Sequence, residues 1–136
     1  MEIKILTFDI KGDPLGYLIA FESNKNVPFE IKRTYYIYDI AVSDVRGKHA
    51  HKKLRQVLIC ARGKCTLLFD DNREKQKVEL DRPNQGVVID PMVWHEIYDF
   101  SPDCLLIGLA SDFYDESDYL RNEGEFRRAS QKKNRA

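Results

Sequence analysis

The chain has 136 residues, of which 43% are hydrophobic, and it carries 22 basic and 22 acidic side chains. This length and apolar content predict one globular domain with a substantial core and argue against disorder. Because the charges balance, no overall field attracts nucleic acid or an anionic membrane. No stretch reaches the roughly 18 apolar residues of a membrane-spanning helix. The first residues lack the long apolar core of a signal peptide, so we expect a cytoplasmic protein.

Short apolar runs rich in β-branched and aromatic residues recur over the first 110 residues and predict strands. Turn-forming residues separate these runs, and none shows a sustained helical period, which argues against a parallel α/β sheet. The rhythm is typical of an all-β sandwich or barrel. The expected strands are residues 3–8, 18–21, 31–38, 57–61, 66–69, 78–80, 87–89, 95–100 and 105–110.

The end of the chain differs in composition, with acidic residues first and basic residues last. This order suits helix dipoles and predicts one or two short helices, interrupted near Gly124. We therefore expect a single domain over residues 1–136, with a barrel at about 1–112 and a helical tail at about 113–136. The basic segment 127–135 has no interleaved aromatic residues, which favours a solvated tail over a nucleic-acid patch.

Three cysteines, Cys60, Cys65 and Cys104, are odd in number and include no Cys-x-x-Cys pair. This pattern argues against a disulfide framework and a zinc knuckle. Cys60 and Cys65 flank a predicted turn and can face each other across a hairpin. The sequence favours reduced thiols that fill core space.

The strand at residues 31–38 combines charged and apolar residues on one face. Alternation places Arg33 and Tyr35 on the same side as Ile31 and Ile37. If that face lines a barrel, the arginine needs an anionic partner, and a phosphate matches the planar guanidinium. A surface arginine on a strand whose other face is the core is an equally open interpretation.

Two of the three histidines, His49 and His51, share one face of an extended chain. A His-x-His pair on one face can chelate a metal ion, and the pattern resembles the first motif of the cupin barrels. The glutamate of that motif is missing at residues 54–56, and the second motif, ending at His95, lacks its glycine. We therefore predict no metal here and interpret the pair as candidates for acid–base chemistry, with structural histidines as the alternative.

Four collinear segments, residues 31–37, 46–58, 91–96 and 109–119, closely resemble the dTDP-4-keto-6-deoxyglucose 3,4-ketoisomerases. The resemblance implies an isomerase with a cupin jelly-roll barrel and no metal or other cofactor. It implies a dTDP-sugar substrate in a pathway to the 3-amino-3,6-dideoxy sugars of surface polysaccharides such as lipopolysaccharide O-antigens. It further implies a homodimer whose subunits exchange N-terminal strands.

The reaction of that family moves a carbonyl from sugar carbon 4 to carbon 3 through an enediol. The resemblance implies His49 as the main base, with His51 and Tyr35 relaying or donating protons. It also implies that Arg33 and Arg46 hold the pyrophosphate. Gln56 and His95 are expected near the sugar, whereas Trp94 is equally suited to the core.

The product's configuration at carbon 4 is not fixed by the sequence. His95 resembles the galacto-configured branch of the family, but Leu15 stands where other members carry arginine or tyrosine. Three other functions stay open: a sugar-nucleotide 3,5-epimerase, a non-catalytic sugar-nucleotide binding module, and a metal-dependent cupin oxygenase.

Overall fold

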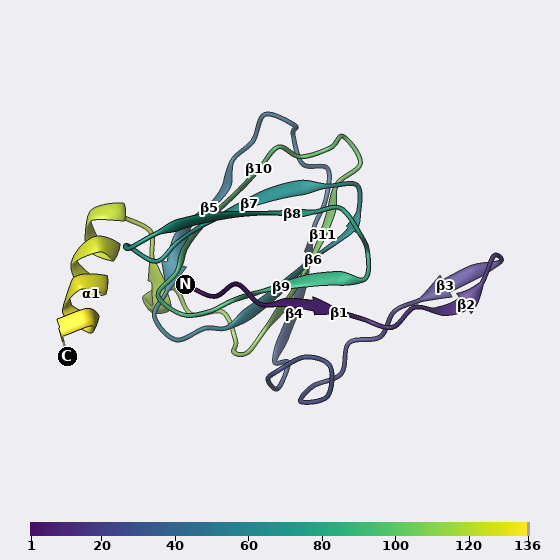
Figure 1. Cartoon of the computed structure of the whole chain (residues 1–136), viewed down its shortest axis with the longest axis horizontal. Coiled ribbons are helices and arrows are strands. Elements are labelled where there is room, and N and C mark those ends of the chain that lie inside the picture. Colours follow the sequence, from purple (N-terminus) through teal and green to yellow (C-terminus); the bar gives the residue numbers. More distant parts are fainter. Residues whose placement is uncertain (136) are drawn as a thin grey trace.

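The computed structural model describes residues 1–135 and contains two five-stranded antiparallel sheets that face each other (Figure 1). In spatial order, the first sheet consists of β1 (Ile5–Thr7), β9 (Gln85–Ile89), β6 (Gln56–Arg62), β11 (Leu105–Ala110) and β4 (Arg33–Ile37). The second consists of β12 (Tyr119–Leu120), β5 (Arg46–His51), β10 (Trp94–Tyr98), β7 (Cys65–Asp70) and β8 (Lys75–Leu80).

Two further parts lie outside this barrel. The hairpin of β2 (Lys11–Asp13) and β3 (Gly16–Leu18) projects away from the body, and the helix α1 (Glu123–Arg135) lies at the opposite end (Figure 1). A single 3-10 turn, η1 (Glu116–Asp118), precedes β12. In the described part of the chain, no helix is long and apolar enough to cross a membrane.

The main core fills the space between the two sheets because inward-facing apolar side chains alternate along the strands. The strand β6 is buried on both faces, which explains its continuous apolar run. Its outward side chains Val57 and Ile59 pack under the N-terminal segment, against Phe8, Val27 and Phe29. Its inward side chains Leu58 and Cys60 join the main core, which includes Leu67, Phe69, Val87, Ile97 and Leu106.

The predicted all-β jelly-roll barrel with a short C-terminal helix is confirmed, but the tail is not helical throughout. Residues 119–120 form β12, which pairs with β5 through Tyr119 opposite His51 and Leu120 opposite Ala50. Leu120 is buried with Ala50, Trp94 and Phe126. Burial of the Leu120 side chain outweighs the local helical pattern. An interruption was expected near Gly124, but this residue lies within α1, and the non-helical part of the tail ends before it.

Candidate active site

A cavity of about 280 Å³ opens between the two sheets and gathers most of the candidate residues. Of the seven candidate site residues predicted from the sequence, all except His51 line this cavity. These six side chains come from four different strands. The cavity is lined by Arg33, Tyr35 and Ile37 of β4, Arg46, Gly47 and His49 of β5, Gln56 and Leu58 of β6, Ile89 of β9, His95 and Ile97 of β10, and Tyr119 of β12.

His49 is held in one orientation by its own strand. Its Nδ1 lies 2.9 Å from the carbonyl oxygen of Gly47, so the ring donates its Nδ1 proton there. Nε2 is then left with a free lone pair. Burial is the largest influence on this imidazole and lowers its pKa below the ordinary value of 6.5. The ring is therefore neutral at pH 7 and able to accept a proton at Nε2.

His51 lies beside His49 but does not line the same cavity. The ring centroids of the two histidines are 4.8 Å apart, edge to face. His51 is 2% exposed and lines an adjoining cavity of about 180 Å³. Within residues 1–135, neither of its ring nitrogens makes a hydrogen bond. Burial lowers its pKa to about 4. The two imidazoles thus lie side by side, as predicted, but they line different cavities.

Asp118, to which the sequence assigned no role, is the acidic group closest to His51. Its Oδ2 lies 3.5 Å from Nδ1 of His51. Its two carboxylate oxygens accept hydrogen bonds from the backbone N–H groups of Lys53 and Leu54, at 2.9 and 3.1 Å. Asp118 therefore ties the segment after β5 to the C-terminal tail and holds its carboxylate beside His51. Its place in an acidic run had indicated only a helix start.

Tyr35 donates its hydroxyl proton to Oε1 of Gln56, at 2.5 Å. Its ring covers Gly108 of β11, where a Cβ would lie only 2.1 Å from the ring carbon Cζ. A glycine is therefore required for the tyrosine to reach the cavity. Burial raises the pKa of Tyr35 to about 12, so the hydroxyl keeps its proton at neutral pH.

The two candidate arginines differ in their surroundings. Arg33 lines both cavities, and its buried Nε has no hydrogen-bond partner within the described residues. Its guanidinium carbon lies 5.5 Å from the centroid of the Tyr35 ring. Arg46 is exposed and makes a loose contact of 3.5 Å with Asp44. The buried Nε donor of Arg33 is suited to an anionic ligand.

His95 and Tyr119 complete the aromatic part of the site. The ring of His95 lies 4.6 Å from that of His49, and burial lowers its pKa to about 3. Tyr119, which sequence reasoning missed, has its ring centroid 4.9 Å from that of His49 and 4.3 Å from that of His51. Trp94 points the other way and packs against Phe126, so it belongs to the core.

The three histidines do not bring their nitrogen atoms into one compact set of metal donors. Over residues 1–135, the only group of three or more histidine, cysteine or acidic side chains with ligand atoms within 4.8 Å of one another is Cys60, Cys65 and Cys104. The Nδ1 of His49 is also occupied by the carbonyl of Gly47. The histidine cluster is therefore better arranged for proton transfer than for chelation.

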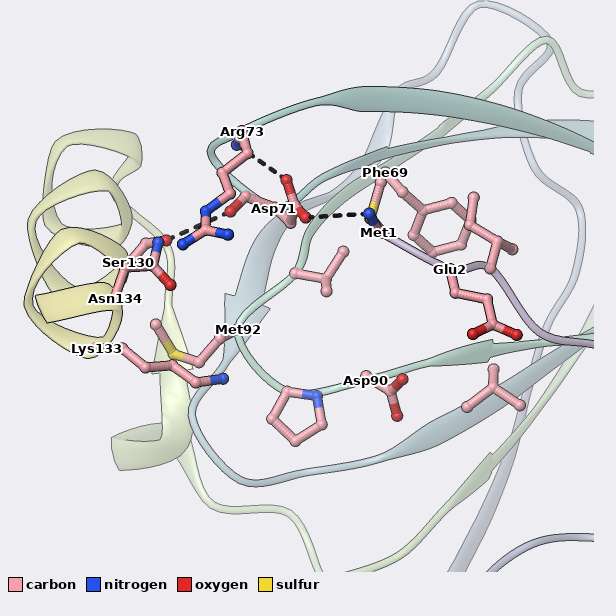
Figure 2. A pocket seen from close by; sticks show the side chains of 14 residues that line it. Met1, Glu2, Phe69, Asp71, Arg73, Asp90, Met92, Ser130, Lys133 and Asn134 are labelled. Carbon is pink, nitrogen blue, oxygen red and sulfur yellow. Dashed lines mark hydrogen bonds and ion pairs between the residues drawn. The ribbon is translucent and has the colours of Figure 1, made fainter. Parts of the chain in front are cut away.

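A second opening, of about 260 Å³, lies between the β7–β8 turn, the segment before β10, and α1 (Figure 2). Its lining is charged, with Asp71, Arg73, Asp90 and Lys133, and it contains no histidine. The N-terminal ammonium group reaches into it, 3.9 Å from Oδ2 of Asp71. Asp71 is therefore already paired, and the described lining residues include no imidazole for proton exchange near neutral pH.

Comparison with known proteins gives matches along nearly the whole chain. Residues 1–131 match the FdtA family, which is described as WxcM-like, C-terminal. A TDP-4-oxo-6-deoxy-alpha-D-glucose-3,4-oxoisomerase of Aneurinibacillus thermoaerophilus is 49% identical over 128 residues, which are 94% of this chain and 92% of the relative.

Solved structures give the same result. A 3,4-ketoisomerase from Helicobacter canadensis superposes with a TM-score of 0.93 at 48% identity, covering 96% of this chain and 98% of that one. A 3,4-ketoisomerase from Thermoanaerobacterium thermosaccharolyticum, solved in complex with TDP-4-keto-6-deoxyglucose, superposes with a TM-score of 0.92 at 38% identity, covering 96% and 94%.

Proposed function

This chain belongs to the FdtA family, and we propose that it is a sugar-nucleotide 3,4-ketoisomerase that converts dTDP-4-keto-6-deoxy-D-glucose to a dTDP-3-keto-6-deoxyhexose. Relatives that are 49%, 48% and 38% identical to this chain are isomerases of this kind. This similarity identifies the chain as an isomerase. The observation that carries the proposal is the neutral, oriented imidazole of His49 at the same cavity as the protonated hydroxyl of Tyr35.

The isomerisation moves two protons, one from carbon 3 to carbon 4 and one from oxygen 3 to oxygen 4. His49 accepts the proton from carbon 3 at Nε2, and the electron pair of that C–H bond forms the enediolate as the carbon 4 carbonyl becomes an oxyanion. When the sugar is bound, the Tyr35 hydroxyl turns its one proton from Oε1 of Gln56 to the developing negative charge. The hydroxyl proton of oxygen 3 then passes to the oxyanion at oxygen 4, and the imidazolium of His49 returns its proton to carbon 4, which gives the neutral 3-keto sugar and restores the base. A positioned base of this kind contributes about 10²- to 10⁴-fold in rate.

His51 relays or stores protons behind His49. Its ring contacts the edge of His49, and Asp118 lies next to its Nδ1. Gln56 and His95 face the sugar from the neighbouring strands. Gln56 accepts the hydrogen bond of Tyr35, so its carbonyl oxygen orients the tyrosine hydroxyl.

The pyrophosphate of the substrate is assigned to Arg33 and Arg46. Arg33 offers a buried Nε without a hydrogen-bond partner in the described chain, and Arg46 stands at the rim of the same cavity. A nucleotide diphosphate carries about two negative charges, and guanidinium groups match its oxygens in pairs. This remote binding holds the sugar in position for reaction at carbon 3.

We further propose a homodimer in which the β2–β3 hairpin is exchanged between subunits. The hairpin projects from the barrel (Figure 1) and exposes large apolar side chains, including Leu15 at 97%, Tyr17 at 69% and Leu18 at 58%. Such a patch favours an interaction surface. Exchange would bring Leu15 to another subunit.

Light scattering on the intact chain should give twice the monomer mass. The double substitution Tyr17→Ser and Leu18→Ser should shift the measured mass toward that of the monomer. A monomeric intact chain would refute the exchange.

The decisive experiment is incubation of the purified protein with dTDP-4-keto-6-deoxyglucose in deuterated water, followed by proton NMR. Loss of the carbon 3 proton signal together with a 3-keto product is the expected result, and the coupling at carbon 4 reports the gluco or galacto configuration. Exchange at carbon 5 would instead indicate a 3,5-epimerase. Binding without exchange or isomerisation would indicate a binding module and refute the catalytic proposal.

A further inference from the structure

All three cysteines of the chain meet at one point in the core, although they come from distant parts of the sequence. Cys60 lies in β6, Cys65 begins β7, and Cys104 directly precedes β11. Their sulfur atoms all lie within 4.8 Å of one another, and those of Cys60 and Cys104 are 3.7 Å apart. The three are free thiols with 0%, 1% and 4% of their surfaces exposed.

The spacing of these sulfur atoms suits a single metal ion. Thiolate sulfur binds zinc at about 2.3 Å, and three sulfurs at that distance in a plane around one ion lie about 4.0 Å from each other. The observed spacing is therefore within reach of such a ring with small side-chain adjustments. We propose that Cys60, Cys65 and Cys104 form a binding site for a soft, thiophilic ion, with Cu(I) as its ligand.

The choice of ion follows from the number and kind of donors. Zinc in structural sites takes four ligands, whereas the compact group in the described chain offers three, all of them sulfur. Burial keeps bulk water from serving as a fourth ligand. Thiolate donors select soft ions such as Cu(I), and this ion accepts three-coordinate sulfur sites. Binding involves no redox step: the ion stays Cu(I), and each coordinating thiol releases its proton to solvent.

One surface depression borders the thiol cluster at Cys65. A depression of about 270 Å³ is lined by Cys65 with Lys64, Thr66, Glu79 and Asp99. Its two carboxylates outnumber the one ammonium group of Lys64, which favours the approach of a cation. Because Cys65 is 1% exposed, an ion reaches its sulfur through local opening of the chain at this depression.

The thiol site is separate from the isomerase cavity. Cys60 follows Gln56 by four residues along the same strand, which corresponds to about 13 Å of extended chain. None of the three cysteines lines the cavity of His49. The site can therefore be altered without touching the proposed chemistry, and its test does not depend on the isomerase assignment.

The test is an anaerobic titration of the fully reduced chain with Cu(I) held by a competing chelator of known affinity. Thiol titration in denaturant first establishes three free thiols per chain. We expect one Cu(I) per chain to transfer from the chelator, with near-ultraviolet thiolate-to-copper absorption and a rise in the thermal midpoint, because the ligand binds the folded state.

Two variants and one other metal complete the experiment. Cys104→Ala and Cys65→Ala should each weaken Cu(I) binding by at least about tenfold, while the circular dichroism spectrum stays as in the parent chain, which reports correct folding. Equal binding by parent and variants would overturn the site, as would unfolding of the parent on addition of Cu(I). Tighter binding of Zn²⁺ than of Cu(I) would overturn the choice of ion.

Discussion

The Nδ1 atom of His49 lies 2.9 Å from the carbonyl oxygen of Gly47, two residues earlier in the same strand. This contact is possible because Gly47 has a φ of +80°, a conformation that side-chain-bearing residues rarely adopt. The bend turns the carbonyl toward the imidazole and leaves Nε2 as the acceptor of protons. The tautomer of the proposed base is therefore set by a glycine.

Gly47→Ala should impair both folding and catalysis. A Cβ at this position would lie 2.9 Å from the carbonyl oxygen of His95 and would strain the positive φ. We expect a loss of about 1–2 kcal/mol in the free energy of unfolding and a fall in kcat of about 10- to 100-fold. Gly16→Ala is the control, because nothing lies within 4 Å of its added Cβ. Equal urea midpoints and rates for the two variants would contradict the role of Gly47.

His49→Asn should abolish most of the turnover without loss of substrate binding. Removing a positioned base lowers kcat by about 10²- to 10⁴-fold, whereas calorimetric binding of dTDP should stay as in the parent chain. Lys48→Asn supplies a matched control, because Lys48 is exposed and its positive φ suits asparagine. A His49→Asn variant that turns over normally would remove His49 from the mechanism.

Much of the site could be predicted because strand alternation is a local property. Arg33 and Tyr35 were expected on one face of their strand, and both line the cavity. His49 and His51 were expected on one face of theirs, and their rings are in contact, although His51 lines a separate cavity. Tyr119 escaped prediction, because its approach to the histidines depends on pairing between β12 and β5.

Other features depend on contacts between strands that are distant in sequence. The hydrogen bond between Tyr35 and Gln56 joins β4 to β6 across the intervening β11. It exists only because Gly108 of β11 leaves room for the tyrosine ring. The resemblance that linked Gln56 to the sugar carried no information about this partner. The separation of His51 into its own cavity likewise follows from the tail that folds over it.

Tyr35→Phe should slow isomerisation while the fold is kept. Loss of a donor to a developing oxyanion costs about 10²- to 10³-fold in kcat. Because burial raises the pKa of Tyr35 to about 12, the parent should show no loss of activity from this group up to about pH 10. Tyr36→Phe is the matched control, since Tyr36 is 67% exposed on the other face. A similar kcat for both variants would assign the donor elsewhere.

Asp118→Asn should change the titration of His51. The carboxylate is the main group that raises the pKa of this buried imidazole against the effect of burial, so the variant should lower it further, as measured by NMR of the ring protons. The kcat should fall by about tenfold, with restoration in Asp118→Glu. Asp112→Asn is the control, because Asp112 lines the same adjoining cavity as Asp118. An unchanged His51 pKa would remove Asp118 as its positioning residue.

Stability should fall as the pH drops below about 6.5, because the buried histidines must be neutral in the folded chain. Burial lowers the pKa to about 4 for His51 and about 3 for His95. Between about pH 6.5 and 4 the unfolded chain therefore binds protons that the folded chain does not. The free energy of unfolding then decreases by up to about 1.4 kcal/mol per pH unit for each such histidine.

Urea unfolding at a series of pH values between about 7.5 and 4.5 measures this slope. Arg127 holds the pKa of the Asp70 carboxylate below 3.8. The stability that this carboxylate contributes is therefore lost only below the measured pH range, and the slope within that range reports the histidines. His51→Asn should reduce the slope by up to about 1.4 kcal/mol per pH unit, whatever its effect on stability at neutral pH. A slope that is the same in parent and variant would mean that His51 gains its proton in the folded state, and the neutral relay proposed behind His49 would then fail.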